Sequence, residues 1–317
     1  VHEERNGSEA SIEKVSDYIQ RVSDYIEARK EDRHFFVYRG EPELYPSPCR
    51  PGLFRMSTLT ENPFFEKNLF HTMRQNKLTG DRSYLENAID AQHGEFPSRL
   101  LDVSYNCLTA LYFAVTPYYH KAEDALDDRD GRVFVFFLDE IFSPSAENIN
   151  ENYNAVINRD RPWSQEFLFR KNHKFVDYTK INSRIVAQQG GFILFQGDAA
   201  EELPKRLYYG ITIPGDAKPR LRAELKELFG IHTGSIYPEV INLVKELTGK
   251  SGRMNTQAFT CENELRYTLE QLRRELDYYL DYALSQKRSQ AEEDTMRQIL
   301  ARVEKVVNSY REGLVHM

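Results

Sequence analysis

The hydrophobic pattern of the chain changes repeatedly between the periods of helices and of strands. Apolar residues recur every three or four positions, as in amphipathic helices, in four segments: residues 11–29, 61–92, 216–229 and 236–247. Near-continuous apolar runs predict strands in four others: residues 34–41, 132–138, 192–195 and 206–214. Residues 145–175 follow neither period, and we expect them to be irregular. Because strands do not alternate strictly with helices, we predict an α+β fold with a central mixed or antiparallel sheet and flanking helices.

The two ends of the chain carry heptad repeats that favour packing between helices. The sequence VSDYI occurs twice within residues 15–26, and beyond residue 256 two segments space their apolar residues by four and three in turn. The stretch TGKSGRMN, which precedes those segments, is a candidate linker. We therefore expect a homodimer through the helical ends, and four parts: an N-terminal heptad helix at residues 1–33, an α+β core at 34–247, the linker at 248–255 and a C-terminal helical hairpin at 256–317.

Composition indicates a globular protein without a strongly cationic surface. Apolar residues make up 40% of the chain, charged residues make up 29%, and the net charge is −7. This charge disfavours binding of nucleic acid by overall attraction but allows a local basic groove. The three cysteines lie far apart without a metal-binding spacing, so we expect no metal site and a reducing compartment. Without a signal-peptide pattern or a run of about 20 apolar residues, we expect a cytoplasmic protein with no membrane partner.

Residues 92–115, QHGEFPSRLLDVSYNCLTALYFAV, place many polar side chains directly before an apolar helix. From Tyr105 onward the apolar positions i, i+3, i+4 and i+7 predict a buried helix. The start of such a helix carries partial positive charge and free N–H groups, which suit an anion. If all the polar side chains were buried they would need a large satisfied network, so a ligand-binding cleft is the simpler interpretation. The polar side chains are those of Gln92, His93, Ser98, Arg99, Asp102, Ser104 and Asn106.

Structural interpretations compete with this one. Arg39 or Arg99 can pair with Asp102 and join a strand to the helix. Ser104 is as good a helix N-cap as a ligand-binding hydroxyl. The remaining candidates, which suit a loop, a β-bulge or the core equally well, are His93, Gln188, Gln189, Tyr105, Tyr112 and Phe113.

Four ordered motifs resemble the FRG domain, a bacterial family named for a strand that reads Phe/Tyr-Arg-Gly. FVYRGE at residues 36–41 matches that strand, and residues 92–114 match the family's middle motif. RIVAQQGGFILF at 184–195 and the segment from ITIP to SIYPEV at 211–240 match its later motifs. The resemblance covers residues 34–247, and the FRG name carries no settled reaction.

A more distant similarity is to arginine-type mono-ADP-ribosyltransferases. VYRG resembles their first strand, and LLDVS followed by TALYFA resembles their Ser-Thr-Ser strand and the helix after it. AQQGGFILF stands where their Glu-x-Glu turn belongs, but it carries Gln188 and Gln189 in place of glutamates. This similarity implies a split sheet of the ADP-ribosyltransferase type and NAD as a substrate.

The similarity also implies roles for particular residues. Arg39, with the N–H groups near Ser104, would hold the pyrophosphate of NAD. Asp102, or failing it Glu41, would stabilise a cationic ribose, because glutamine cannot supply negative charge. Tyr38, Tyr105 and Phe113 are candidates to flank the nicotinamide. The implied cofactor-binding residues are Tyr38, Arg39, Gly40, Gln92, Arg99, Ser104, Asn106 and Gln188, and the implied catalytic residues are Asp102, Gln189 and His93.

Three functions follow as hypotheses. The first is an ADP-ribosyltransferase-like or NAD-cleaving protein that modifies a protein or nucleic-acid acceptor, in the role of a bacterial toxin or anti-phage effector. The second is a non-catalytic module that binds a nucleotide or nucleic acid, which the two glutamines favour. The third is an interaction scaffold built on the helical ends.

Overall fold

The computed structural model describes residues 11–29, 35–56, 62, 64–78, 83–92, 96–160, 171–177, 183–197, 202–285 and 290–315. His93 and Trp163 lie outside these residues. The chain divides into two compact units, Val1–Thr248 and Gly249–Met317. Among the described residues, none of the helices combines the length and apolar character that a membrane span requires.

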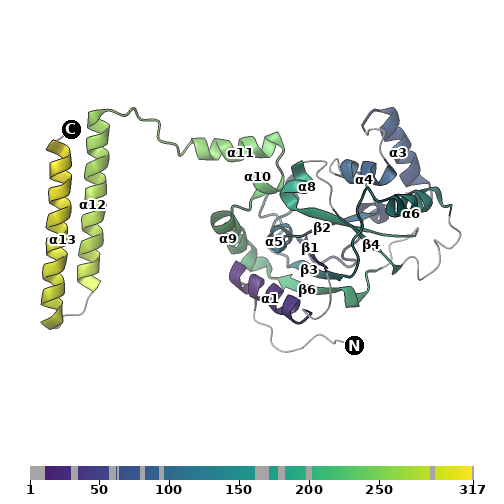
Figure 1. The fold of residues 1–317 in the computed structure, drawn as a ribbon, viewed down its shortest axis with the longest axis horizontal. Helices are drawn as coiled ribbons and strands as arrows, with labels where there is room; N and C mark the ends of the chain where they lie inside the picture. The colour runs from purple at the N-terminus through teal and green to yellow at the C-terminus, as the bar shows by residue number, and fades with distance from the viewer. Residues whose placement is uncertain are drawn as a thin grey trace. The chain divides into compact units, whose positions relative to one another are not determined.

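The first unit is built on one six-stranded sheet in the order β4-β5-β2-β1-β3-β6 (Figure 1). All neighbouring strands pair in the antiparallel sense, so the predicted α+β class with an antiparallel sheet is confirmed, whereas the ADP-ribosyltransferase-like sheet is not. The strands are β1 Phe35–Glu41, β2 Leu100–Ser104, β3 Gly131–Leu138, β4 Lys174–Val176, β5 Gly190–Leu194 and β6 Tyr208–Ile213.

The helices of this unit flank the sheet, and α11 continues across the boundary between the two units (Figure 1). The α-helices are α1 Val15–Glu27, α3 Phe65–Gln75, α4 Tyr84–Ala91, α5 Cys107–Val115, α6 Glu147–Asn158, α8 Ser183–Gln188, α9 Lys218–Phe229, α10 Thr233–Ile236 and α11 Val240–Ser251. Short 3-10 helices are η1 Gly52–Arg55, η4 Lys205–Leu207 and η5 Gly215–Ala217.

The sheet is weakly joined at its centre. Strands β1 and β3 are in register from Phe35 to Glu41, but β1 and β2 share the single registered pair Tyr38–Ser104. Beyond that pair the two central strands separate. Arg39, on β1, donates from Nη1 to the carbonyl oxygen of Asp102, on β2, across this separation at 2.9 Å.

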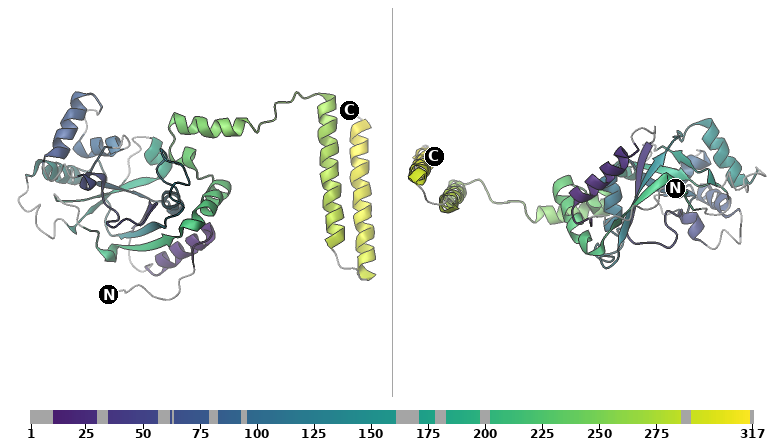
Figure 2. Two further views of the ribbon diagram at one scale, coloured as in Figure 1. Left: turned by 180° about the vertical axis from the view of Figure 1, so that it is seen from behind. Right: turned by 90° about the horizontal axis from the view of Figure 1, so that it is seen from below.

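Helix α5 lies directly on β1 and β3, and two glycines make this close approach possible. A Cβ atom on Gly40 would lie 1.9 Å from the carbonyl oxygen of Ala110, and one on Gly131 would lie 2.3 Å from that of Ala114. Helices α1 and α9 pack with α5 in the same core (Figure 2). The glycine after Arg39 therefore has a packing role, because any side chain there would displace the helix.

One prediction about local structure is wrong and another holds only in part. Residues 145–175 contain helix α6, which buries Ile149, Tyr153 and Ile157 on one side. Its asparagines hid this spacing, since asparagine is a poor helix former. In α1 and the residues just before it, Ile12, Val15 and Val22 of the apolar repeat are buried as expected, but Ile19 is 39% exposed and Tyr18, outside that repeat, is fully buried.

The second unit is a hairpin of two long helices, α12 Cys261–Ser285 and α13 Gln290–Val315, which lie side by side and antiparallel (Figure 2). Among the described residues of this unit, these two helices pack on each other without a third long helix or a sheet. Leu269 is 52% exposed and Leu300 is 60% exposed, although both belong to the predicted seams.

Candidate functional site

Two adjoining cavities lie where β1 and β2 separate. The larger, which we call the main cavity, has a volume of about 450 Å³. The smaller, which we call the side cavity, has a volume of about 340 Å³. Arg39, Gln92 and Asp102 line both cavities, so these three residues stand at the junction between them.

The main cavity combines cationic and aromatic side chains from separate parts of the chain. Its cations are Arg39, Lys121 and Arg184. Its aromatic residues are Tyr38, Tyr45, Phe113, Tyr118 and Tyr237. Asp102 is the one acidic residue among the described residues that line either cavity. Such a lining suits an anionic ligand that carries a planar ring.

Arg39 is fixed by a buried carboxylate. Its Nε donates to Glu41 Oε1 at 3.1 Å, and the same oxygen accepts the backbone N–H of Cys49 at 3.0 Å. Burial alone would lower the pKa of Arg39, but the negative charge of Glu41, with smaller contributions from Cys49 and Asp102, raises it. Arg39 does contact Asp102, as expected, but it bonds the backbone carbonyl of Asp102 and not its carboxylate. The Arg39 side chain remains 18% exposed, which leaves a charged guanidinium accessible from the cavities.

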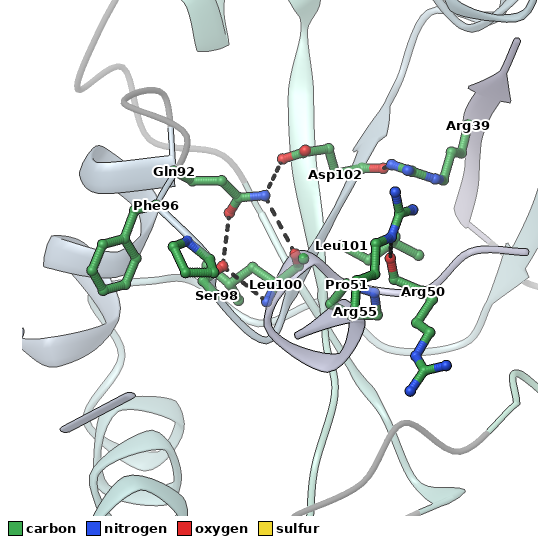
Figure 3. A pocket seen from close by; sticks show the side chains of 12 residues that line it. Arg39, Arg50, Pro51, Arg55, Gln92, Phe96, Ser98, Leu100, Leu101 and Asp102 are labelled. Atoms are coloured by element: carbon green, nitrogen blue, oxygen red, sulfur yellow. Dashed lines mark hydrogen bonds between the residues drawn. The ribbon is translucent and has the colours of Figure 1, made fainter. Parts of the chain in front are cut away.

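The carboxylate of Asp102 has a defined direction because Gln92 holds it (Figure 3). Gln92 Nε2 donates to Asp102 Oδ1 at 2.6 Å and to the carbonyl oxygen of Leu100 at 3.3 Å. Gln92 Oε1 in turn accepts a hydrogen bond from Ser98 Oγ at 3.2 Å. These bonds fix which end of the amide faces Asp102. The site thus has an exposed carboxylate whose orientation is set by neighbouring side chains.

Arg184, another cation of the main cavity, lies beside the rings of two tyrosines. Its Nε donates to Glu239 Oε1 at 2.7 Å, and its guanidinium lies 5.2 Å from the ring centre of Tyr237 and 5.6 Å from that of Tyr119. Burial raises the pKa of Tyr237, so its hydroxyl stays neutral. Burial likewise raises the pKa of Tyr38 to about 12. The cavity therefore offers neutral aromatic rings beside charged guanidinium groups.

A buried lysine holds two loops of the cavity wall. Lys218 is fully buried, and its Nζ donates to the carbonyl oxygens of Pro42 and Leu126, both at 2.7 Å. Pro42 and Leu126 line the main cavity. Lys218 thus joins two distant segments of the wall without facing the ligand space itself.

The sequence comparisons add one match. Residues 34–123 match the family model of the FRG domain. This FRG segment contains β1, β2 and α5, and with them the junction residues Arg39, Gln92 and Asp102. Neither the comparison with curated proteins nor that with solved structures gave a match. The FRG part of the resemblance is therefore supported, whereas the resemblance to ADP-ribosyltransferases is not confirmed.

Most of the predicted binding residues line the main cavity. All of these but Gln188 lie within the FRG segment, residues 34–123, and Gln188 lies beyond it. The main cavity brings together Tyr38, Arg39, Gly40, Gln92, Asp102, Ser104 and Gln188. Ser104 is nearly saturated by protein contacts, since its Oγ donates to the carbonyl oxygen of Gln188 at 2.7 Å and accepts the N–H of Asn106 at 3.0 Å. Gln188 donates from Nε2 to the carbonyl oxygen of Ile236 at 3.2 Å.

The start of α5 is not the anion seat that the sequence suggested. Asn106 is its N-cap, and Asn106 Oδ1 accepts the N–H groups of Leu108 at 2.9 Å and Thr109 at 3.4 Å. These are the groups that an anion would have used. Asn106 lines neither cavity, so the positive charge of the site comes from arginine and lysine side chains.

Arg99 has a structural role in place of the expected ligand contact. It is buried, donates from Nε to Glu66 Oε2 at 2.8 Å, and donates from Nη1 to the carbonyl oxygen of Gly197 at 2.7 Å. Tyr153 completes this network by donating to Glu66 Oε1 at 2.9 Å. A guanidinium used in this way has no access to either cavity.

The remaining predicted residues lie apart from the cavities or outside the described chain. Gln189 is exposed, has a φ of 47° and lines neither cavity. Tyr105 donates to Asp177 Oδ1 at 2.7 Å on the side of β4. His93 lies outside the described residues.

Sequence reasoning missed several residues that line the cavities. Arg184 and Tyr237 belong to the RIVAQQ and SIYPEV motifs, so the motifs indicated their segments but not their roles. Arg50 and Arg55 lie in the Pro-rich loop after β1 and line the side cavity. Neither periodicity nor spacing distinguishes such loop arginines from solvated ones. Their contribution depends on how the loop folds over the sheet.

Proposed function

We propose that the main cavity binds a nucleotide that carries a pyrophosphate, with NAD as the leading ligand, and that the protein cleaves NAD or transfers its ADP-ribosyl group. The observation that carries this proposal is the convergence of Arg39, Arg184 and Asp102 on one cavity lined by tyrosines. The protein then acts as an effector or toxin whose activity depends on the chemistry of this cavity.

Binding is supported by size and by charge. A volume of about 450 Å³ falls within the range of about 300–1,000 Å³ that is typical of small-molecule sites. Guanidinium groups pair with phosphate oxygens through charge-assisted, often bidentate, hydrogen bonds. Tyr118, Tyr237 and Phe113 supply aromatic faces for a purine or a nicotinamide.

Catalysis is assigned to Asp102. Cleavage of the bond between nicotinamide and ribose passes through a cation on the sugar, as glycoside hydrolysis does. A carboxylate aimed at that cation stabilises it most when its orientation is fixed in advance, and Gln92 supplies this orientation through its bond to Oδ1. In this proposal Gln188, which also lines the cavity, bonds a ribose hydroxyl.

The test measures NAD binding by calorimetry and nicotinamide release by chromatography on the full chain. Asp102→Asn keeps the size of the side chain, so binding should change little while release falls by about 10²–10³-fold, the usual cost of one electrostatic contact to a transition state. Asp177→Asn is the matched control, because Asp177 bonds Tyr105 and lines neither cavity. Absence of NAD binding by the wild type would refute the proposal.

A non-catalytic nucleotide-binding module is the second candidate. It is favoured by the presence of one carboxylate, that of Asp102, among the described residues that line the cavities, and by Gln188 in a position where the resemblance leads one to expect glutamate. This candidate predicts NAD binding without nicotinamide release, both in the wild type and in Asp102→Asn.

A further inference from the structure

The side cavity concentrates positive charge on the other side of the junction residues. Among the described residues, its lining includes the arginines Arg39, Arg50 and Arg55 and one carboxylate, that of Asp102. Arg55 is held in place because its Nε donates to the carbonyl oxygen of Arg50 at 2.9 Å (Figure 3). Its guanidinium also lies 5.6 Å from the ring centre of Tyr45. The guanidinium of Arg55 is therefore held beside the cavity, although Arg55, like Arg50, is exposed.

Placing the guanidinium groups of Arg39 and Arg55 together is unfavourable without an anion. Burial, and next the positive charge of Arg39, lower the pKa of Arg55. The carboxylate of Glu41 compensates Arg39, with which it forms an ion pair, and that of Asp102 is engaged by Gln92. The arrangement gains most from a ligand with more than one negative charge, because like charges at short range repel each other until an anion neutralises them.

We propose that the side cavity binds the phosphate monoester of an acceptor, to which the ADP-ribosyl group held in the main cavity is transferred. The inference rests on the proposed function of the main cavity. The two cavities share lining residues, so a group bound in either cavity lies beside the same carboxylate, that of Asp102. A donor in one cavity and an acceptor in the other would meet at that side chain.

A phosphate acceptor also fits the absence of a dedicated base in the described lining. No histidine lines either cavity among the described residues, and Asp102 is the one carboxylate. A hydroxyl or amine acceptor must lose a proton, whereas a phosphate monoester carries a charge of about −1.5 to −2 at pH 7 and is already a nucleophile.

The step balances without a further reagent. The bond between the anomeric carbon and the nicotinamide nitrogen breaks, and its electron pair leaves with neutral nicotinamide. A lone pair of the phosphate oxygen forms the new carbon–oxygen bond, which gives a phosphodiester. Nothing is oxidised or reduced, and no proton is taken up when the phosphate is dianionic.

The size and charge of the protein favour a terminal phosphate over a long duplex. The net charge is −7, and the arginines line one cavity of about 340 Å³ instead of an extended basic surface of the kind that binds duplexes. The phosphate of a free mononucleotide and that at the end of an oligonucleotide share this chemistry. The experiment therefore includes both.

The experiment measures binding of AMP, adenosine and a short single-stranded oligonucleotide with and without a terminal phosphate, followed by transfer of label from NAD. Wild type should prefer each phosphorylated probe by about tenfold or more, because hydrogen bonds to charged groups are lost with the phosphate. Arg50→Gln and Arg55→Gln should each remove that preference while leaving NAD affinity unchanged. Arg220→Gln is the matched control, since Arg220 is exposed and pairs with Glu224 within α9.

The outcomes separate the two proposals. Equal binding of phosphorylated and unphosphorylated probes, or unchanged preference in Arg50→Gln, which replaces an exposed residue, overturns the inference. If nicotinamide is released but no phosphorylated probe is labelled, the acceptor inference fails and the proposed function stands. If the phosphate preference depends on Arg50 but NAD is not bound, the proposed function fails and with it the transfer step. Label on the phosphate of a probe supports both.

Discussion

Replacing Gly40 by alanine tests whether the glycine after Arg39 serves packing or ligand binding. The added Cβ would lie 1.9 Å from the carbonyl oxygen of Ala110, 2.6 Å from the backbone nitrogen of Ala114 and 2.9 Å from Cβ of Phe113. Two of these atoms belong to the backbone of α5 and cannot turn aside. Relief of the shortest contact requires α5 to move away from β1 by more than about 1 Å, and a gap of about 0.5–1 Å already forfeits roughly a quarter to a half of each dispersion contact along the interface.

The magnitude follows from this displacement. Overpacking costs about 1–3 kcal/mol where side chains can adjust, so we expect Gly40→Ala to cost about 3 kcal/mol or more. For a folded unit of this length, Val1–Thr248, each kcal/mol lowers the melting temperature by about 2–4 °C. The melting temperature from circular dichroism should therefore fall by roughly 6–12 °C.

The control is Gly249→Ala, because a Cβ atom on Gly249 would have no neighbour within 4 Å. Gly249 lies within α11, where alanine favours the helix by about 0.5–1 kcal/mol, so that variant should melt no lower than the wild type. If Gly40→Ala melted normally and lost only ligand affinity, the packing account of the glycine would be wrong.

Two further predictions concern the buried ion pair and the hairpin. Arg99→Met should destabilise the protein by about 3–5 kcal/mol in urea unfolding, because it leaves Glu66 buried without its cation, and adding Glu66→Gln should recover part of the loss. If Arg99→Met were stable but failed to bind NAD, the structural role of Arg99 would be wrong and its predicted ligand contact would be right. The full chain should sediment as a dimer, because Leu269 and Leu300 are more than half exposed on the hairpin, and Leu269→Lys should yield monomers, with exposed Arg266→Ala as the control. A monomeric wild type would contradict this.

The sequence predicts the strands better than the site. Apolar runs locate β1, β3, β5 and β6 because buried strands need apolar residues at nearly every position. Helix α6 escapes detection because its buried residues are separated by asparagines, and only packing against α3 and α4 compensates for their low helix propensity.

For the site, sequence identifies the polar cluster but not the pairing of its members. Arg99 and Asp102 lie three residues apart, yet Arg99 is bonded to Glu66 and Asp102 to Gln92. Successive side chains along a strand point to opposite faces. Asp102 lies within β2, Leu100–Ser104, whereas Arg99 precedes the strand. This alternation explains why the two side chains have different partners. Arg184 and Tyr237 reach the cavity from segments far along the chain, and a local pattern does not report such tertiary contacts.

The single registered pair between β1 and β2 has a mechanical consequence. It divides the sheet into two three-stranded halves, β4-β5-β2 and β1-β3-β6, joined by the Tyr38–Ser104 pair and by the hydrogen bond from Arg39 to the carbonyl oxygen of Asp102. A ligand that contacts Arg39 on one half and the carboxylate of Asp102 on the other would add a further connection between the halves. Ligand binding would then slow amide hydrogen exchange where β1 meets β2, so the exchange rate there would report whether the cavities are occupied.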